Sequence, residues 1–249
     1  MAKIIDLSVP LTTRTQHLRN VNIEYIDHKI FQKVRAPELG LKDDDFPEWG
    51  YCATEKLTLT THDGTHLDAP WHYAPMSEGK PAKTIDQIPL EWCYSDGVVL
   101  DFHHFERERP IQITDLEEAL DKISYKLKPF DIVLIRTDAT KHWLESEYRE
   151  LGAGLIAEST LWLIDHGIKV MGIDSWTWDQ PFDVMLKRGA PEKFLESHKI
   201  GYNREYCHIE SMANLDKIPR PFGFKVAAFP INVEGGSAGW TRAVAIIEE

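Results

Sequence analysis

The amino-acid sequence predicts an α/β fold with a mixed, partly parallel sheet. Residues 131–136 form an apolar run that is typical of a strand buried on both faces. A helical pattern over residues 155–166 ends at Gly167, which suits a left-handed cap, and residues 168–173 follow as another buried strand. A strand, a helix and a strand in this order favour a parallel unit with a right-handed crossover.

The remaining elements are predicted from alternation, capping and breaker residues. Residues 10–54 look irregular, and prolines between 70 and 92 predict that this stretch is not helical. A helix is expected from Thr114 to about Lys126, where a capping box precedes an apolar face. Strands are expected over residues 3–9, 55–60, 97–102, 224–231 and 240–247.

Composition bounds the function. A chain of 249 residues with 43% hydrophobic residues predicts a single domain over residues 1–249. The net charge of −12 argues against nucleic-acid or anionic-membrane partners. No apolar run is long enough to span a bilayer, and the first residues lack the apolar core of a signal peptide. Three scattered cysteines are interpreted as free thiols in a reducing cytoplasm.

The stretch from Thr61 to His72 is the strongest candidate for a functional site. His62, His66, Asp68 and His72 all occupy even positions, so in an extended chain their side chains project to one face. Gly64 and Pro70 disfavour a helix, so a strand that runs into a loop is expected. Imidazole and carboxylate groups without cysteine suit Zn²⁺, Mn²⁺ or Fe²⁺. The alternative is a histidine-rich surface loop.

The same stretch carries a family resemblance. Residues 62–72 match HxGTHxDxPxH, a pattern that resembles the metal-dependent cyclase-type hydrolases, which include bacterial kynurenine formamidase and isatin hydrolase. The resemblance extends from Ile5–Ser8 to Phe229–Ile231. It implies a swivelling β/β/α fold for the domain.

The resemblance also implies a set of metal ligands. One ion would bind His62, His66 and Asp68. A second would use Asp68, His198 and Glu210, with Asp68 and Glu210 shared between the two ions. His198 and Glu210 are twelve residues apart.

Two histidines have alternative roles. His208 rivals His198 as the distal ligand, because residues 208 and 210 would share a strand face. His72 resembles the family's catalytic histidine, and an imidazole that titrates near neutrality can move a proton between water and a leaving nitrogen. The alternative is that His72 is a further metal ligand.

Three tryptophans are candidates for substrate binding. Trp176 and Trp178 follow a buried strand, whose C-terminal end is where α/β folds collect ligands. Trp71 adjoins His72. For each of them, packing in the core is the alternative.

These features together predict a metal-dependent hydrolase that opens a C–N bond of a small cyclic or aryl amide. One or two Mn²⁺ or Zn²⁺ ions would activate water, with His72 as the base. Residues 11–17 lack the tryptophan of the kynurenine formamidase branch, and residues 83–86 and 176–179 look more like isatin hydrolase. The alternatives are an arylformamidase acting on N-formylkynurenine, a lactone hydrolase, and a non-catalytic protein that binds metal or a small molecule. A homodimer is expected from the resemblance and from the tryptophan-bearing loop at residues 40–52.

Overall fold

The computed structural model describes residues 2–15 and 21–248. Residues 16 and 17 of the segment 11–17 therefore lie outside the described residues, as does Met1. The described chain forms two compact units. The larger comprises residues 2–11, 15 and 61–248, and the smaller comprises residues 12–14 and 21–60.

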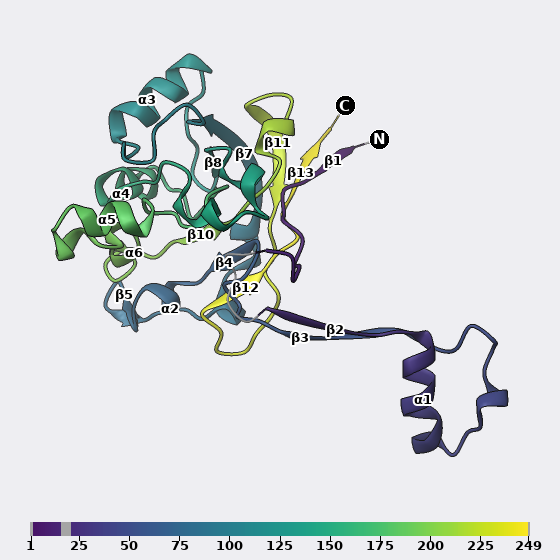
Figure 1. The fold of residues 1–249 in the computed structure, drawn as a ribbon. Coiled ribbons are helices and arrows are strands. Elements are labelled where there is room, and N and C mark those ends of the chain that lie inside the picture. Colours follow the sequence, from purple (N-terminus) through teal and green to yellow (C-terminus); the bar gives the residue numbers. More distant parts are fainter. Residues whose placement is uncertain (1, 16–20, 249) are drawn as a thin grey trace. The chain divides into compact units, whose positions relative to one another are not determined.

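The larger unit is built on a nine-stranded mixed sheet with the order β1-β13-β11-β7-β8-β9-β10-β4-β12 (Figure 1). The strands of this sheet are β1 (Lys3–Asp6), β4 (His66–Asp68), β7 (Tyr94–Asp101), β8 (Ile132–Arg136), β9 (Val170–Ile173), β10 (Cys207–Glu210), β11 (Phe222–Ala227), β12 (Ala238–Trp240) and β13 (Val244–Ile247). Strands β7 to β10 are parallel to one another, and the flanking pairs are antiparallel. The predicted mixed, partly parallel sheet is therefore confirmed.

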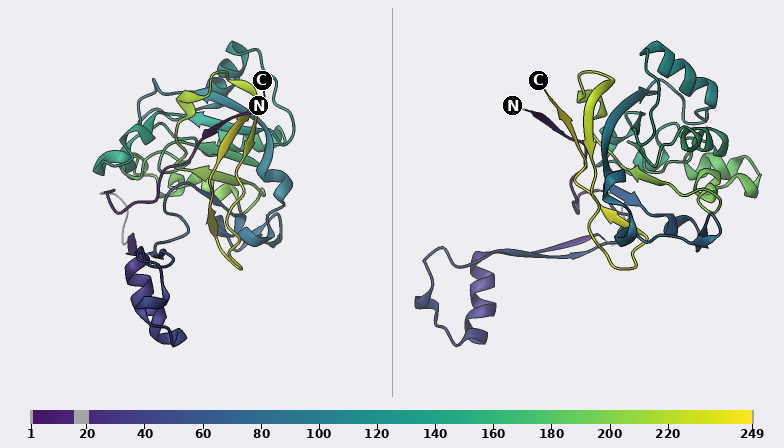
Figure 2. Two further views of the ribbon diagram at one scale, coloured as in Figure 1. Left: turned by 90° about the vertical axis from the view of Figure 1, so that its right-hand side faces the viewer. Right: turned by 180° about the vertical axis from the view of Figure 1, so that it is seen from behind.

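Helices cover one face of this sheet, as Figures 1 and 2 show. They are α3 (Ile113–Lys122), α4 (Ala157–Asp165), α5 (Phe182–Lys187) and α6 (Glu196–Ile200). Strand β8 illustrates why both faces are apolar. Val133 and Ile135 join the hydrophobic cluster that includes side chains of α3 and α4, whereas Ile132 and Leu134 join the cluster on the other face. The core thus lies on both sides of the parallel strands.

The predicted strand–helix–strand unit is confirmed as β8, α4 and β9, with β8 and β9 parallel and adjacent. Gly167 ends the unit's helix with a φ of 83°, in the left-handed region where glycine is favoured. The prediction that residues 70–92 are not helical was wrong for α2 (Pro70–Tyr73). Pro70 stands in the first turn, where a helix needs no backbone N–H from it. The short strands β5 (Met76–Ser77) and β6 (Lys80–Pro81) follow.

The smaller unit corrects the prediction that residues 10–54 are irregular. Strands β2 (Asn22–Ile26) and β3 (Thr54–Thr58) pair antiparallel, and helix α1 (His28–Leu39) follows β2. The Asp27 carboxylate caps α1 by accepting from the N–H groups of Lys29 and Ile30, and Gly40 ends it with a φ of 69°. Pro37 suggested a break, but it lies in the last turn of the helix.

Among the described residues, no helix combines the length and the apolar character that crossing a membrane requires. Cys52, Cys93 and Cys207 are free thiols, as the sequence predicted, and the last two are buried.

Candidate metal centre

The centre begins with the pairing of β4 and β10. In this antiparallel register His66 lies opposite Glu210, and Asp68 lies opposite His208. Partners in register and residues two apart on a strand share one face of the sheet, so all four side chains point the same way. Each of them is buried. The pairing joins two segments that are about 140 residues apart in sequence, and residue spacing alone cannot reveal it.

His62 and His72 approach this face from the two ends of β4. Residues 61–65 form turns, in which Gly64 has a φ of 75°, and α2 carries His72. His62 Nδ1 lies 2.9 Å from Asp68 Oδ1, and His72 Nε2 lies 3.7 Å from Asp68 Oδ2. The predicted convergence of the four side chains is therefore present. The extended conformation offered for it was wrong, because the strand spans only residues 66–68.

Two buried atoms of the cluster, His66 Nε2 and Asp68 Oδ1, are positioned to bind a metal ion. His66 Nδ1 lies 2.9 Å from the carbonyl oxygen of Gly64 and donates to it, so Nε2 is the ring atom that a metal ion would bind in place of a proton. That Nε2 lies 3.2 Å from Asp68 Oδ1 and 3.7 Å from Glu210 Oε2. Among the residues that the structure describes, neither His66 Nε2 nor Asp68 Oδ1 has a hydrogen-bond partner. Buried polar atoms are rarely left unsatisfied, and a divalent cation between nitrogen and oxygen donors would satisfy both. The residues present thus fit a metal ion.

The structure brings both distal histidines to the cluster. His198 Nε2 lies 3.8 Å from Glu210 Oε1. His208 Nε2 lies 3.3 Å from the same oxygen and 3.0 Å from Asp68 Oδ2. One ligand atom from each of Asp68, His198, His208 and Glu210 can be chosen so that all lie within 4.8 Å of one another. Either histidine is close enough to share an ion with the two carboxylates.

The carboxylates are ionised although they are buried. Burial acts to raise the pKa of Glu210, but hydrogen bonding to His208 and the nearby histidine charges bring it to about 2. Burial also acts to raise the pKa of Asp68, but the surrounding histidines, including hydrogen bonds from His208 and His62, hold it well below its usual value. For His72, loss of hydration lowers the pKa to about 4, so its ring is neutral at pH 7.

Comparison with known proteins identifies the family. Residues 5–180 match the family model described as "Putative cyclase". The chain belongs to the cyclase family. It is 26% identical over 191 residues to a kynurenine formamidase of Erythrobacter litoralis, covering 76% of this chain and 74% of that protein.

Two solved structures show the same fold. An isatin hydrolase bound to the product analogue thioisatinate superposes with a TM-score of 0.78 at 20% identity, covering 100% of this chain and 93% of that one. A predicted metal-dependent hydrolase from Bacillus stearothermophilus gives a TM-score of 0.65 at 18% identity, with 100% of both chains covered. The predicted resemblance and fold class are confirmed. The named relatives are hydrolases, and this chain is an enzyme of their family.

The three candidate tryptophans have different surroundings in this cyclase-family chain. Trp71 is exposed beside His72. Trp176 is half-buried, with the Arg149 guanidinium 4.0 Å from its ring centroid. Trp178 has no exposed surface; its indole N–H donates to Thr160 Oγ1, and its ring stacks on His208 with the centroids 5.9 Å apart. The surroundings of Trp178 fit the core-packing alternative.

Several supporting contacts were not predicted from the sequence. The backbone N–H of Trp178 donates to Glu210 Oε1 at 2.9 Å, and Ser237 Oγ lies 3.0 Å from His62 Nε2. Tyr73 Oη accepts the backbone N–H of His208 at 3.1 Å. Each contact joins segments that the fold brings together, and only the position of Tyr73 next to His72 could have drawn attention to it.

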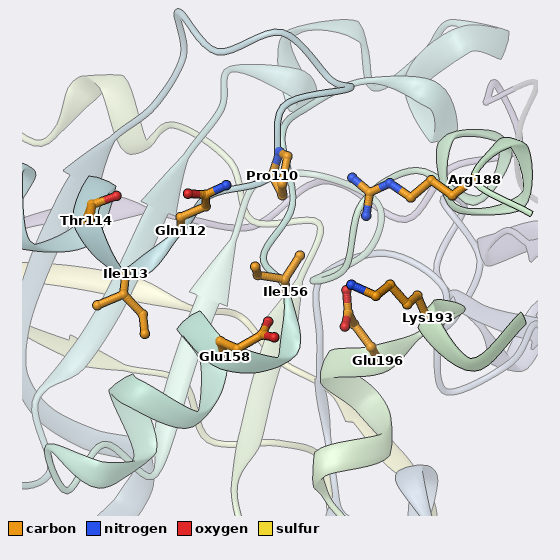
Figure 3. Close-up of a pocket in the computed structure, with 9 residues that line it drawn as sticks. All are labelled: Pro110, Gln112, Ile113, Thr114, Ile156, Glu158, Arg188, Lys193 and Glu196. Carbon is orange, nitrogen blue, oxygen red and sulfur yellow. The ribbon is translucent and has the colours of Figure 1, made fainter. Parts of the chain in front are cut away.

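A cavity of about 460 Å³ lies elsewhere on the larger unit, with charged side chains of both signs (Figure 3). Its lining residues are Pro110, Gln112, Ile113, Thr114, Ile156, Glu158, Arg188, Lys193 and Glu196. None of them belongs to the histidine and carboxylate cluster, although Glu196 lies two residues before His198. The cluster rather than this cavity therefore remains the candidate centre.

Proposed function

We propose that this chain is a metal-dependent hydrolase that opens a C–N bond of a small cyclic or aryl amide. The observation that carries the proposal is the facing pair of buried atoms His66 Nε2 and Asp68 Oδ1, which make no hydrogen bond within the described part of the chain and lie among further histidines and Glu210. A merely structural cluster would leave both atoms unsatisfied at a cost in stability.

The proposed ligands follow from the donor atoms at hand. His62, His66 and Asp68 would hold one ion. A second ion would be held by Asp68, His198 and Glu210, with Asp68 and Glu210 shared between the two ions and with His208 as the rival of His198. Nitrogen and carboxylate donors without thiolate suit Mn²⁺ or Zn²⁺.

In the proposed reaction, the cation and the side chains have different roles. A divalent cation at this site would polarise the substrate carbonyl and lower the pKa of water toward neutrality. His72 is neutral at pH 7 and its side chain is 32% exposed, so it can take a proton from water and return it to the leaving nitrogen. Asp68 Oδ2, 3.7 Å from His72 Nε2, would stabilise the imidazolium that forms.

The substrate side of the proposal rests on aromatic surface near His72. Trp71 is 44% exposed and can offer its ring to a planar substrate, and Trp176 is proposed as a second contact. Trp178 was a third candidate, but its burial favours a supporting role beneath His208. A planar cyclic amide of the isatin type fits such surfaces, and an arylformamide is the second candidate because the curated relative is a kynurenine formamidase.

Metal analysis combined with a substrate panel tests this function. Protein stripped with a chelator should lose hydrolysis of isatin, N-formylkynurenine and a simple lactone alike, and Mn²⁺ or Zn²⁺ should restore the preferred one. Full activity in protein shown to be metal-free would refute metal dependence. Turnover of N-formylkynurenine alone would favour the arylformamidase alternative, and binding of metal without any turnover would favour a binding protein.

We further propose that residues 1–249 act as one catalytic domain in a cytoplasmic homodimer. The exposed Trp49 and Tyr51 in the loop at residues 40–52 support self-association, because a partner could cover these rings.

A further inference from the structure

Asp179 is a buried carboxylate that serves the start of α6. The residue lies in the segment between β9 and α5, and it is 2% exposed. Oδ1 accepts the backbone N–H of Ser197 at 2.8 Å, and Oδ2 accepts the backbone N–H of His198 at 3.3 Å. Oδ2 also accepts from the ring of His198, with 2.6 Å between Nδ1 and Oδ2. One carboxylate thus holds both the backbone and the ring of His198.

The ring contact fixes which nitrogen of His198 is free. A carboxylate only accepts, so Nδ1 must carry the hydrogen, and Nε2 keeps its lone pair. That Nε2 lies 3.8 Å from Glu210 Oε1, where two acceptors face each other without a shared proton. A histidine whose Nδ1–H is held by a carboxylate while Nε2 faces a metal is a recurrent arrangement in metal sites.

His208 is engaged differently. Its Nε2 lies 3.0 Å from Asp68 Oδ2 and 3.3 Å from Glu210 Oε1, so it can donate a hydrogen to the carboxylates and hold them together. Its Nδ1 is buried, and no described residue forms a hydrogen bond with it, so no described side chain favours the opposite tautomer. Of the two rivals, only His198 has a partner that frees Nε2.

The backbone around Asp179 is closely packed. The N–H of Leu155 donates to the carbonyl oxygen of Trp178 at 3.0 Å, and a Cβ added to Gly154 would lie 2.2 Å from the carbonyl carbon of Asp179. The N–H of Trp178 holds Glu210 Oε1 at 2.9 Å. Two consecutive residues therefore orient Glu210 and His198, which sets the spacing of these two groups.

We infer that Asp179 is a positioning residue that fixes the tautomer and orientation of His198 and so directs its Nε2 toward the proposed distal ion. The inferred tautomer of His198 depends only on the hydrogen bonds. The role of His198 as a metal ligand rests on the proposed metal-dependent function.

The first test measures the tautomer in metal-free protein. Two-bond ¹H–¹⁵N spectra of histidine-labelled protein, assigned with His198→Gln, should show His198 with its hydrogen on Nδ1. The experiment needs no turnover and no variant that must fold with Asp179 changed. A hydrogen on Nε2 of His198 would overturn the inference.

The second test uses Asp179→Asn with Asp131→Asn as the matched control. Asp131 is also a buried carboxylate, but it accepts from Tyr125 Oη and the N–H of Lys128, and no hydrogen bond or ion pair joins it to a described histidine. Asp179→Asn should lose the Nδ1–H preference and bind the second equivalent of Zn²⁺ about 10–100-fold more weakly. Asp131→Asn should keep both properties even if its stability falls. Equal affinity in Asp179→Asn and wild type would overturn the positioning role.

Metal stoichiometry separates the two histidines. His198→Gln should lose the distal ion, and His208→Gln should retain it under saturating Zn²⁺; the reverse result would overturn the choice of ligand. If the tautomer is as inferred but the protein hydrolyses no amide with any metal, the proposed function fails while the role of Asp179 stands.

Discussion

Replacing Asp174 with asparagine should change how stability depends on pH. Asp174 follows β9 and is 2% exposed. Its Oδ1 accepts from Thr137 N and Thr137 Oγ1, and its Oδ2 accepts from the N–H of Asp138. Burial nevertheless outweighs these hydrogen bonds and raises the pKa of Asp174 from 3.8 to about 6.

The direction in which stability changes with pH follows from proton linkage. Because the folded pKa lies above the unfolded value, the folded protein binds more protons between pH 4 and 6, and stability from this group is lost as pH rises through about 6. A shift from 3.8 to about 6 corresponds to about 3 kcal/mol in total, of which about 2 kcal/mol falls between pH 4.5 and 7. Asparagine does not titrate, so the variant lacks this contribution.

Urea unfolding of both proteins in chelator at several pH values measures the effect. Chelator removes the pH dependence of metal binding, and Asp138 stays ionised throughout because its pKa is lowered to about 2 despite partial burial, by hydrogen bonds from Arg136 and Lys141. The stability of wild type relative to Asp174→Asn should fall by about 2 kcal/mol from pH 4.5 to 7. If the stability of wild type relative to Asp174→Asn stays constant or rises over this range, the hydrogen bonds to Asp174 lower its pKa at least as much as burial raises it.

Three further outcomes test the centre and the assembly. His72→Ala should keep its metal and lose turnover by about 10²–10⁴-fold, whereas His66→Ala should lose metal outright; equal metal loss, measured by elemental analysis, would make His72 a ligand. Glu210→Gln should reduce two bound ions to one, and a single ion in saturated wild type would contradict the two-ion proposal. Sedimentation at micromolar concentration should give a dimer, and a monomer would refute self-association.

The features that the sequence predicted well are those set by neighbours along the chain. The apolar run of β8 and the cap at Gly167 are local, and they correctly indicate a buried parallel strand and the end of α4. Helix α1 was missed because the prolines of residues 10–54 indicated an irregular segment, whereas Pro37 lies within the last turn of the helix. Prolines misled in the same way at Pro70, where the first helical turn accepts them.

The metal centre also has one half set by neighbours along the chain and one half set by tertiary contacts, and this difference has a mechanistic consequence. His62, His66, Asp68 and His72 come from one short segment, so a turn, a three-residue strand and a short helix suffice to gather them. His198 and Glu210 reach the same face only through the β4–β10 register and the contacts of residues 178–179.

Substitutions that disturb tertiary contacts should therefore affect the distal ligands, His198 and Glu210, without affecting the ligands of residues 62–72. Loosening the packing near Gly154 or Asp179 acts on the distal ligands while the local segment keeps its own geometry. Such a variant would hold the first ion and lose the second. If the first ion alone sustains hydrolysis, turnover should survive that loss; if it does not, the spacing set by residues 178–179 is part of the catalytic requirement. The distal half of the site, whose ligands the family resemblance indicated but whose approach to the first half depends on the β4–β10 pairing, is then the part that decides between one-ion and two-ion chemistry.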